Sequence, residues 1–204
     1  MLKAICIAFV LLLGSYVVNA ESYAFVGAAF PLILEENKKG EVSGLGADIA
    51  GKIALKLGHT IHIPIYPWKR ALSLVELGKA DALIGPYKTP AREQLLDYNQ
   101  YPFYSDSMVF YVRSYEEFEW DGDYSRLQDK EIGITRGWSF GATFDRNKSR
   151  LNIQVLDTVA GNFNKLIYSR IDLFASNARN SMAVIKQMNI AHRVKVMARP
   201  ITIN

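Results

Sequence analysis

The chain has almost no cysteine, and this scarcity excludes several kinds of chemistry. Its single cysteine among 204 residues is Cys6, which lies near the N-terminus. The rest of the chain can therefore form no disulfide and use no thiol. Beyond residue 20, no stretch approaches ~18 consecutive apolar residues, so no membrane-spanning helix is expected there. The chain also has no low-complexity tract, and 50% of its residues are hydrophobic, which argues against intrinsic disorder.

Strong charge of either sign is missing as well. The chain has 24 Lys and Arg against 20 Asp and Glu, a net charge of +4, and no run of five or more basic residues. We therefore expect no nucleic-acid partner. His59 and His62 fall on one expected strand, where a spacing of three points them to opposite faces. No cluster of His, Asp or Glu has the spacing of metal ligands, so we predict neither a metal nor a cofactor.

The first 20 residues have the layout of a secretory signal peptide. Lys3 gives the N-terminal region a positive charge, an apolar segment runs from Ile5 to Leu13, and small residues precede a cleavage point before Glu21. The apolar segment is too short for a comfortable membrane span, and Cys6 lies too early for lipidation. We predict an exported, periplasmic protein without a lipid anchor. Its mature net charge would be +3, because Lys3 is the only charged residue removed.

The first hundred residues of the mature chain alternate between strand and helix patterns. Apolar strands are expected at 23–29, 59–65 and 82–84. Between them, one helix runs from Asp48 to a stop at Gly58, and another runs from Pro67 to Gly78. This alternation predicts a parallel sheet that is covered by helices.

After a β-rich run at 108–113, the alternation starts again. The later expected elements are strands at 131–135, 153–156, 172–175 and 194–197, a helix after the turn at 137–141, a helix capped by Asp157 or Thr158, and a helix capped by Asn177. We predict an α/β fold with two lobes, each a mainly parallel sheet flanked by helices. The predicted limits are 21–107 for lobe 1, 108–114 for a hinge crossover and 115–199 for lobe 2.

Arg92 is the leading candidate for a binding residue. The strand at 82–84 ends at Gly85, and Thr89 and Pro90 read as the cap and first position of a helix. Arg92 would then lie in the first helical turn, where a guanidinium and free backbone N–H groups can together hold a carboxylate. A solvated surface arginine is the alternative. The position of Arg92 and of the turn at 136–139, both just beyond strand ends, favours a shared cleft between the lobes.

Six segments in this order resemble the type II periplasmic solute-binding proteins of ABC importers, in particular the polar amino-acid-binding group, bacterial extracellular solute-binding family three. The segments are Phe30-Pro31, Gly44-Leu45-Gly46-Ala47-Asp48-Ile49-Ala50, Gly78-Lys79-Ala80-Asp81-Ala82, Thr89-Pro90-Ala91-Arg92, Gly133-Ile134-Thr135-Arg136-Gly137-Trp138-Ser139 and Arg170-Ile171-Asp172-Leu173.

The resemblance implies a type II periplasmic binding fold and roles for several residues. It implies that Arg92 pairs with the ligand's α-carboxylate, that Phe30 flanks the ligand, and that Ser139 completes the carboxylate site at a helix start. It also implies a monomer that closes about its hinge and delivers its solute to a membrane ABC permease. Residues 200–204 would begin a return crossover to lobe 1, whose remainder is missing, so that lobe 1 would expose apolar surface.

Two departures from the family pattern affect the ligand. Asn177 stands where amino-acid binders have an acid for the α-ammonium, and an amide cannot neutralise a buried charge. The turn before Arg92 has Pro86, Tyr87 and Lys88 in place of small hydroxyl residues. Our hypothesis is that the carboxylate end is recognised and the ammonium end is weakened. The ligand would be an organic acid, an anionic peptide-like compound, or an amino acid held differently.

Several of these residues have other interpretations. Trp68 and Tyr87 either stack on the ligand or pack the lobes together, and Trp138 is expected to line the cleft. The segment 137–141 also matches the G-x-S-x-G elbow of serine hydrolases, with His192 last in the chain order. We reject that match because no glycine-rich oxyanion segment is present. The same fold also serves as the sensor domain of membrane signalling proteins.

Overall fold

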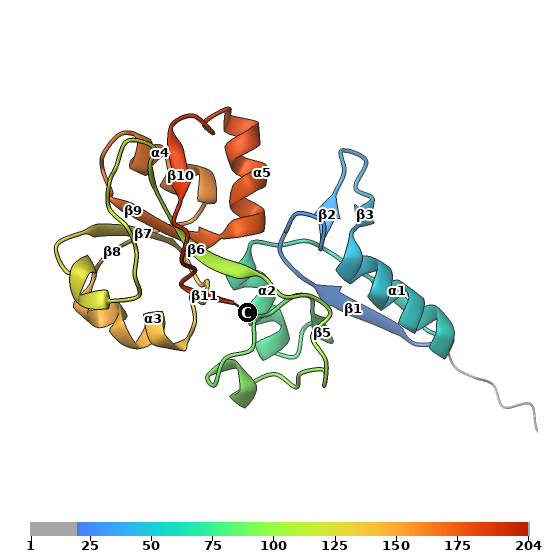
Figure 1. The fold of residues 1–204 in the computed structure, drawn as a ribbon. Coiled ribbons are helices and arrows are strands. Elements are labelled where there is room, and N and C mark those ends of the chain that lie inside the picture. Colours follow the sequence, from blue (N-terminus) through green and yellow to red (C-terminus); the bar gives the residue numbers. More distant parts are fainter. Residues whose placement is uncertain (1–19, 204) are drawn as a thin grey trace, which may run out of the picture.

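The structure is a computed structural model that describes residues 20–203. The predicted signal peptide, residues 1–20, therefore lies outside the described residues except for Ala20. The chain forms two groups of elements that lie side by side, each with its own sheet (Figure 1). No helix within residues 20–203 is long and apolar enough to cross a membrane.

The first lobe is built on a three-stranded parallel sheet with the order β4-β1-β5. Its strands and helices are β1 (Ser22–Val26), β2 (Glu35–Glu36), β3 (Val42–Ser43), α1 (Leu45–Leu57), β4 (Thr60–His62), α2 (Trp68–Glu76), β5 (Ala82–Leu83) and the short 3-10 helix η1 (Arg92–Gln94). The predicted alternation of strands and helices is confirmed. Helix α1 ends as predicted, because Gly58 takes the left-handed conformation at its C-cap with φ 75°. It begins at Leu45, however, one turn before the predicted Asp48.

The second lobe has a six-stranded sheet with the order β10-β6-β9-β7-β8, and β11 also pairs with β6. Its elements are β6 (Ser107–Arg113), η2 (Tyr124–Leu127), β7 (Glu131–Thr135), α3 (Ala142–Asn147), η3 (Lys148–Arg150), β8 (Asn152–Leu156), α4 (Val159–Ile167), β9 (Leu173–Asn177), α5 (Ala178–Met188), β10 (Val194–Val196) and β11 (Thr202–Ile203). The predicted caps Thr158 and Asn177 are confirmed, since each side chain accepts a backbone N–H of the helix that follows it.

Five of the six strands of this second sheet run in the same direction, as predicted, and β6 is the exception. Strand β7 is parallel to β8 and β9, whereas β6 is antiparallel to β9, β10 and β11. The predicted hinge segment 108–114 thus contributes a buried strand to the second sheet, and β11 pairs with it at Ser107 and Met108. The predicted limits of lobes and hinge stay a prediction.

Helices cover both faces of the second sheet. Helices α4 and α5 pack against one face, around Phe163 and Phe174, and α3 packs against the other, around Phe110 and Phe144. The carboxyl ends of β7 and β9 face the first lobe, and the loops and helix starts at those ends carry the residues described next (Figure 1).

Candidate functional site

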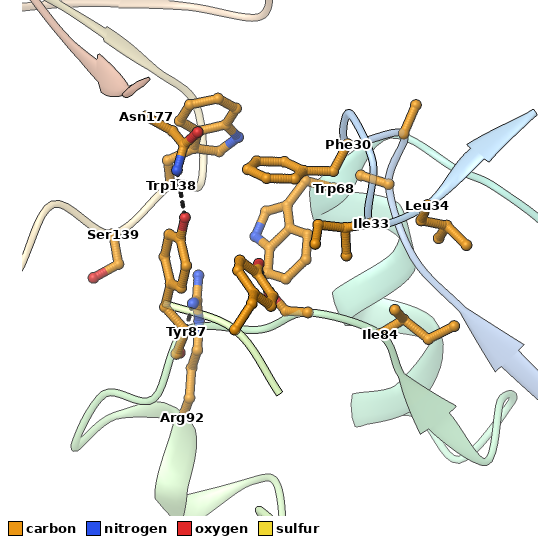
Figure 2. A pocket seen from close by; sticks show the side chains of 14 residues that line it. Phe30, Ile33, Leu34, Trp68, Ile84, Tyr87, Arg92, Trp138, Ser139 and Asn177 are labelled. Carbon is orange, nitrogen blue, oxygen red and sulfur yellow. Dashed lines mark hydrogen bonds between the residues drawn. The ribbon is translucent and has the colours of Figure 1, made fainter. Parts of the chain in front are cut away.

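A pocket between the two lobes gathers all seven side chains that the sequence predicted (Figure 2). The first lobe contributes Phe30, Trp68, Tyr87 and Arg92, and the second contributes Trp138, Ser139 and Asn177; the other lining residues are Ala28, Ala29, Ile33, Leu34, Ile84, Gly85 and Tyr104. The empty space is about 570 Å³, part of it open to solvent. That size suits a small molecule. The role of each side chain in ligand binding stays a prediction.

Arg92 reaches from the first lobe to the second. The predicted helix is here only a three-residue 3-10 helix that begins at Arg92, with Ala91 in place of Thr89 as its N-cap, although Thr89 Oγ1 does accept the backbone N–H of Arg92 at 3.2 Å. Its guanidinium donates to the carbonyl of Tyr87 at 2.9 Å and to the carbonyl of Gly137, in the second lobe, at 3.2 Å. It also lies over the Trp68 ring, 5.2 Å from the centroid. Burial lowers the pKa of Arg92 from its ordinary value.

Asn177 connects the lobes in a second place. Its amide nitrogen donates to the Tyr87 hydroxyl at 2.6 Å, and its amide oxygen accepts the Asn180 N–H at the start of α5 at 2.9 Å. The side chain is fully buried. Both ends of this amide are therefore occupied within the protein. Burial raises the pKa of Tyr87 far above its ordinary value of 10.0, so its hydroxyl stays protonated at any physiological pH. Tyr87 both lines the pocket and packs against the core of the second lobe.

Ser139 does not begin a helix, which corrects the expected geometry. Helix α3 starts at Ala142 with Gly141 as its N-cap, so Ser139 lies in the preceding loop. Its hydroxyl donates to Asp145 Oδ2 at 3.2 Å and is nearly buried. This contact also weakens the hydrolase interpretation, because the partner of Ser139 is a carboxylate and the pocket lining within residues 20–203 includes no histidine.

Aromatic rings make up much of the pocket wall. Phe30 and Tyr87 lie 6.3 Å and 6.4 Å from the ring of Tyr104, measured between centroids. Trp68 and Trp138 add the remaining rings, one from each lobe (Figure 2). The sequence did not point to Tyr104, since it lies in the loop at 101–107, where no periodicity constrains it. Its position just before the buried strand β6 is the one signal that could have found it. Burial raises the pKa of Tyr104 to about 12.

Arg92 is the only charged residue among those that line the pocket. Asp106 is buried nearby and raises the pKa of Tyr104, but its carboxylate is paired with Arg179 Nε at 3.0 Å. The described residues 20–203 contain no group of three or more His, Cys, Asp or Glu side chains that could hold a metal ion.

The indole nitrogen of Trp68 is a further donor at this site. It is buried and has no hydrogen-bond partner. Gly137 lies against this ring, and a Cβ at Gly137 would be 3.3 Å from Trp68 Cδ1. Since Gly137 also has a φ of 75°, glycine suits this close approach of the two lobes. The guanidinium of Arg92 and the indole of Trp68 therefore present donors in the same part of the cleft.

The structure thus has two α/β lobes with a pocket between them. Residues 23–193 match the bacterial extracellular solute-binding proteins, family 3, and the chain belongs to this family. The family expectation from the sequence is thereby confirmed. No curated protein sequence matches the chain.

Solved structures share the fold at low sequence identity. Holo ArgBP from T. maritima has a TM-score of 0.72 and 18% identity, over 89% of this chain and 79% of that one. An ancestral arginine-binding protein bound to arginine has a TM-score of 0.70 and 21% identity, over 89% and 83%. The ancestral amino acid-binding protein AncCDT-1, a precursor of cyclohexadienyl dehydratase, has a TM-score of 0.69 and 17% identity, over 89% and 77%. These similarities support the two-lobed α/β fold.

Proposed function

We propose that this protein binds a small carboxylate-bearing solute, an amino acid or a related organic acid, between its lobes, for ABC-type uptake. It acts in the periplasm as a monomer and hands its unmodified solute to a membrane permease. The observation that carries the proposal is Arg92, a single half-buried charge in a mainly aromatic and apolar pocket.

The chemistry of Arg92 favours a carboxylate partner. Two of its N–H groups are used by the carbonyls of Tyr87 and Gly137, which leaves further donors on the same guanidinium. Those carbonyls are dipoles and do not neutralise the charge, whose desolvation lowers the pKa of Arg92. A ligand carboxylate would offset that desolvation and could also accept from the unpartnered Trp68 indole.

The lining offers much less to an ammonium group. It contains no carboxylate, and both ends of the Asn177 amide are already hydrogen-bonded. A buried ammonium would therefore stay without a counter-charge, which is costly. We infer a preference for acids whose body is apolar or aromatic and whose ammonium is absent or held outside the pocket. This preference differs from that of an ancestral arginine-binding protein of similar fold, which is bound to arginine.

Isothermal titration with three matched probes tests this proposal: 3-phenylpropionate, phenylalanine and phenethylamine share a body and differ in their charged groups. We expect the strongest binding for 3-phenylpropionate and the weakest for phenethylamine. The Arg92→Gln variant should lose about 2–5 kcal/mol of binding free energy, since it removes one partner of a buried charged pair.

Arg70→Gln is the matched control, because Arg70 lies on the exposed side of α2 over the ring of Tyr66 and does not line the pocket. It should leave affinity unchanged. Equal affinity of wild type and Arg92→Gln would remove Arg92 from the site. A clear preference for phenylalanine over 3-phenylpropionate would refute the weakened ammonium end.

A further inference from the structure

The space between the lobes continues beyond the two tryptophans. A second hollow, which we call the outer compartment, shares Ala28, Ala29, Trp68 and Trp138 with the first pocket. Its empty space is about 1320 Å³, part of it open to solvent. The two compartments thus meet at Trp68 and Trp138, one ring from each lobe.

The outer compartment differs from the first pocket in its polar groups. Lys69 lines it from the first lobe, and Arg136 and Asp157 line it from the second. Arg136 Nε and Asp157 Oδ1 lie 2.6 Å apart, and their side chains are 52% and 76% exposed, so water screens this pair. One positive charge, that of Lys69, is left without a counter-charge in the lining.

The start of α4 adds to this positive character. Thr158, Val159 and Ala160 all line the outer compartment, and Thr158 is the N-cap of the nine-residue helix α4. The first backbone N–H groups of an α-helix have no acceptor within the helix, and they carry partial positive charge. The Thr158 hydroxyl satisfies the Gly161 N–H at 3.0 Å. The N–H groups ahead of Gly161 belong to the residues that line the compartment.

Thr135 supplies an independent indication of a ligand. It is the last residue of β7, is 5% exposed, and lines the outer compartment. Its Oγ1 is buried and has no hydrogen-bond partner. The neighbouring Ile134 packs into the core on the α3 side of the sheet, so the side chain of Thr135 faces the α4 side. A buried hydroxyl without a partner is costly in a folded protein, and an acceptor from a ligand would relieve that cost.

We propose that the outer compartment binds a second anionic group at the far end of an elongated solute. This inference rests on the proposed function and names its ligand class: a molecule with a carboxylate at Arg92, an apolar middle between Trp68 and Trp138, and a second carboxylate at Thr135, Lys69 and the start of α4. The Thr135 hydroxyl donates to that second carboxylate. Lys69 and the N-terminal turn of α4 attract it electrostatically.

A series of linear acids tests the inference. Affinities are measured by titration for the diacids from succinate to suberate and for the monoacids from butyrate to octanoate, which match them in carbon number. We expect the longer diacids to bind about tenfold more tightly than their matched monoacids, because the second carboxylate gains charge-assisted hydrogen bonds. The shortest diacids should show no such advantage, since they cannot reach the second compartment.

Two variants locate the effect. Thr135→Val keeps the shape of the side chain and removes its hydroxyl, and it should reduce the diacid-to-monoacid affinity ratio about threefold to tenfold. Lys69→Gln should also reduce the ratio, with an effect that shrinks as salt is added. Thr60→Val is the control, since Thr60 lies exposed on β4, away from the cleft, and it should leave the ratio unchanged.

The possible outcomes separate the two proposals. Equal binding of diacids and monoacids at every length, with Arg92→Gln still harmful, would overturn the outer compartment and leave the proposed function standing. A diacid advantage that survives both Thr135→Val and Lys69→Gln would likewise overturn this assignment. If neither series binds but 3-phenylpropionate does, the outer compartment alone is overturned. Binding of neither series nor of 3-phenylpropionate, or affinities that are indifferent to Arg92→Gln, would overturn the proposed function itself.

Discussion

The two lobes differ in how well their sheets are buried. The central strand of the first sheet, β1, is mostly half-exposed, and the core cluster around it consists of Val26, Ala71 and Ala80. The sheet of the second lobe is covered on both faces. Five phenylalanines of this lobe are fully buried: Phe110, Phe140, Phe144, Phe163 and Phe174. Because buried apolar area is the main stabilising term in folding, the second lobe contributes more of the stability.

The first lobe also exposes apolar side chains. Ile53, Leu55 and Leu57 of α1 are 53%, 80% and 60% exposed, and Leu77 after α2 is 64% exposed. Yet this less buried lobe carries Arg92, the only charge of the first pocket, on a short 3-10 turn. The lobe with the smaller buried core thus contributes the only charged residue of the first pocket, and the lobe with the larger core forms the opposite wall.

Two Phe→Ala substitutions, one in each lobe, give the largest expected effect on the free energy of unfolding. Phe174→Ala in β9 should lower the free energy of unfolding by about 3–5 kcal/mol, because it opens a cavity in a closed core. Phe25→Ala in the half-exposed β1 should cost roughly half as much, since less apolar area is lost. Urea unfolding of both variants measures the difference. Equal losses would show that the lobes are equally well packed, and the comparison would then fail.

Alkaline pH should weaken the fold, in part through Tyr104. Burial raises the pKa of this phenol from about 10 to about 12, so the folded protein keeps a proton that the unfolded chain releases. The resulting stability is present below pH 10 and is lost as the pH rises towards 12. The loss should be on the order of 2–3 kcal/mol.

Urea midpoints at pH 9 and pH 11.5 measure this loss. Tyr104→Phe should show a smaller decrease between the two pH values than wild type. Tyr101→Phe, which removes a hydroxyl from a ring that is 75% exposed, should behave as wild type. A pH dependence that Tyr104→Phe leaves intact would assign the alkaline loss to other groups.

The smallest effect concerns contact between the lobes. Tyr87→Phe removes the hydroxyl that accepts from Asn177 across the cleft, a contact worth about 0.5–1.5 kcal/mol. We expect more of the open form, measured as a larger radius of gyration by small-angle X-ray scattering without added solute. Tyr98→Phe is a matched control, because its hydroxyl donates to the Tyr87 carbonyl at 3.1 Å within the first lobe. An equal expansion of both variants would show that the Tyr87–Asn177 contact does not hold the lobes together.

Local signals were sufficient for much of the fold. Gly58, Thr158 and Asn177 mark helix ends correctly, because capping depends on a few neighbouring residues. The strand at 131–135 was predicted with its observed limits, since it is a short apolar run between turn signals. Local signals were less accurate at Arg92, where Thr89 and Pro90 predicted the start of a helix and only a 3-10 turn forms, with Ala91 as its N-cap.

Some features of the candidate site likewise follow from the sequence, and others arise only from the fold. The alternation of elements, the residues at strand ends and the lack of an acid at Asn177 follow from the sequence alone. The antiparallel pairing of β6 with β9, the place of Tyr104 in the pocket and the contact of Arg92 with Gly137 emerge only in the folded chain. The difference lies in distance along the chain. Periodicity and capping act over a few residues, whereas strand order and contacts between lobes join residues that are 45 to 90 positions apart.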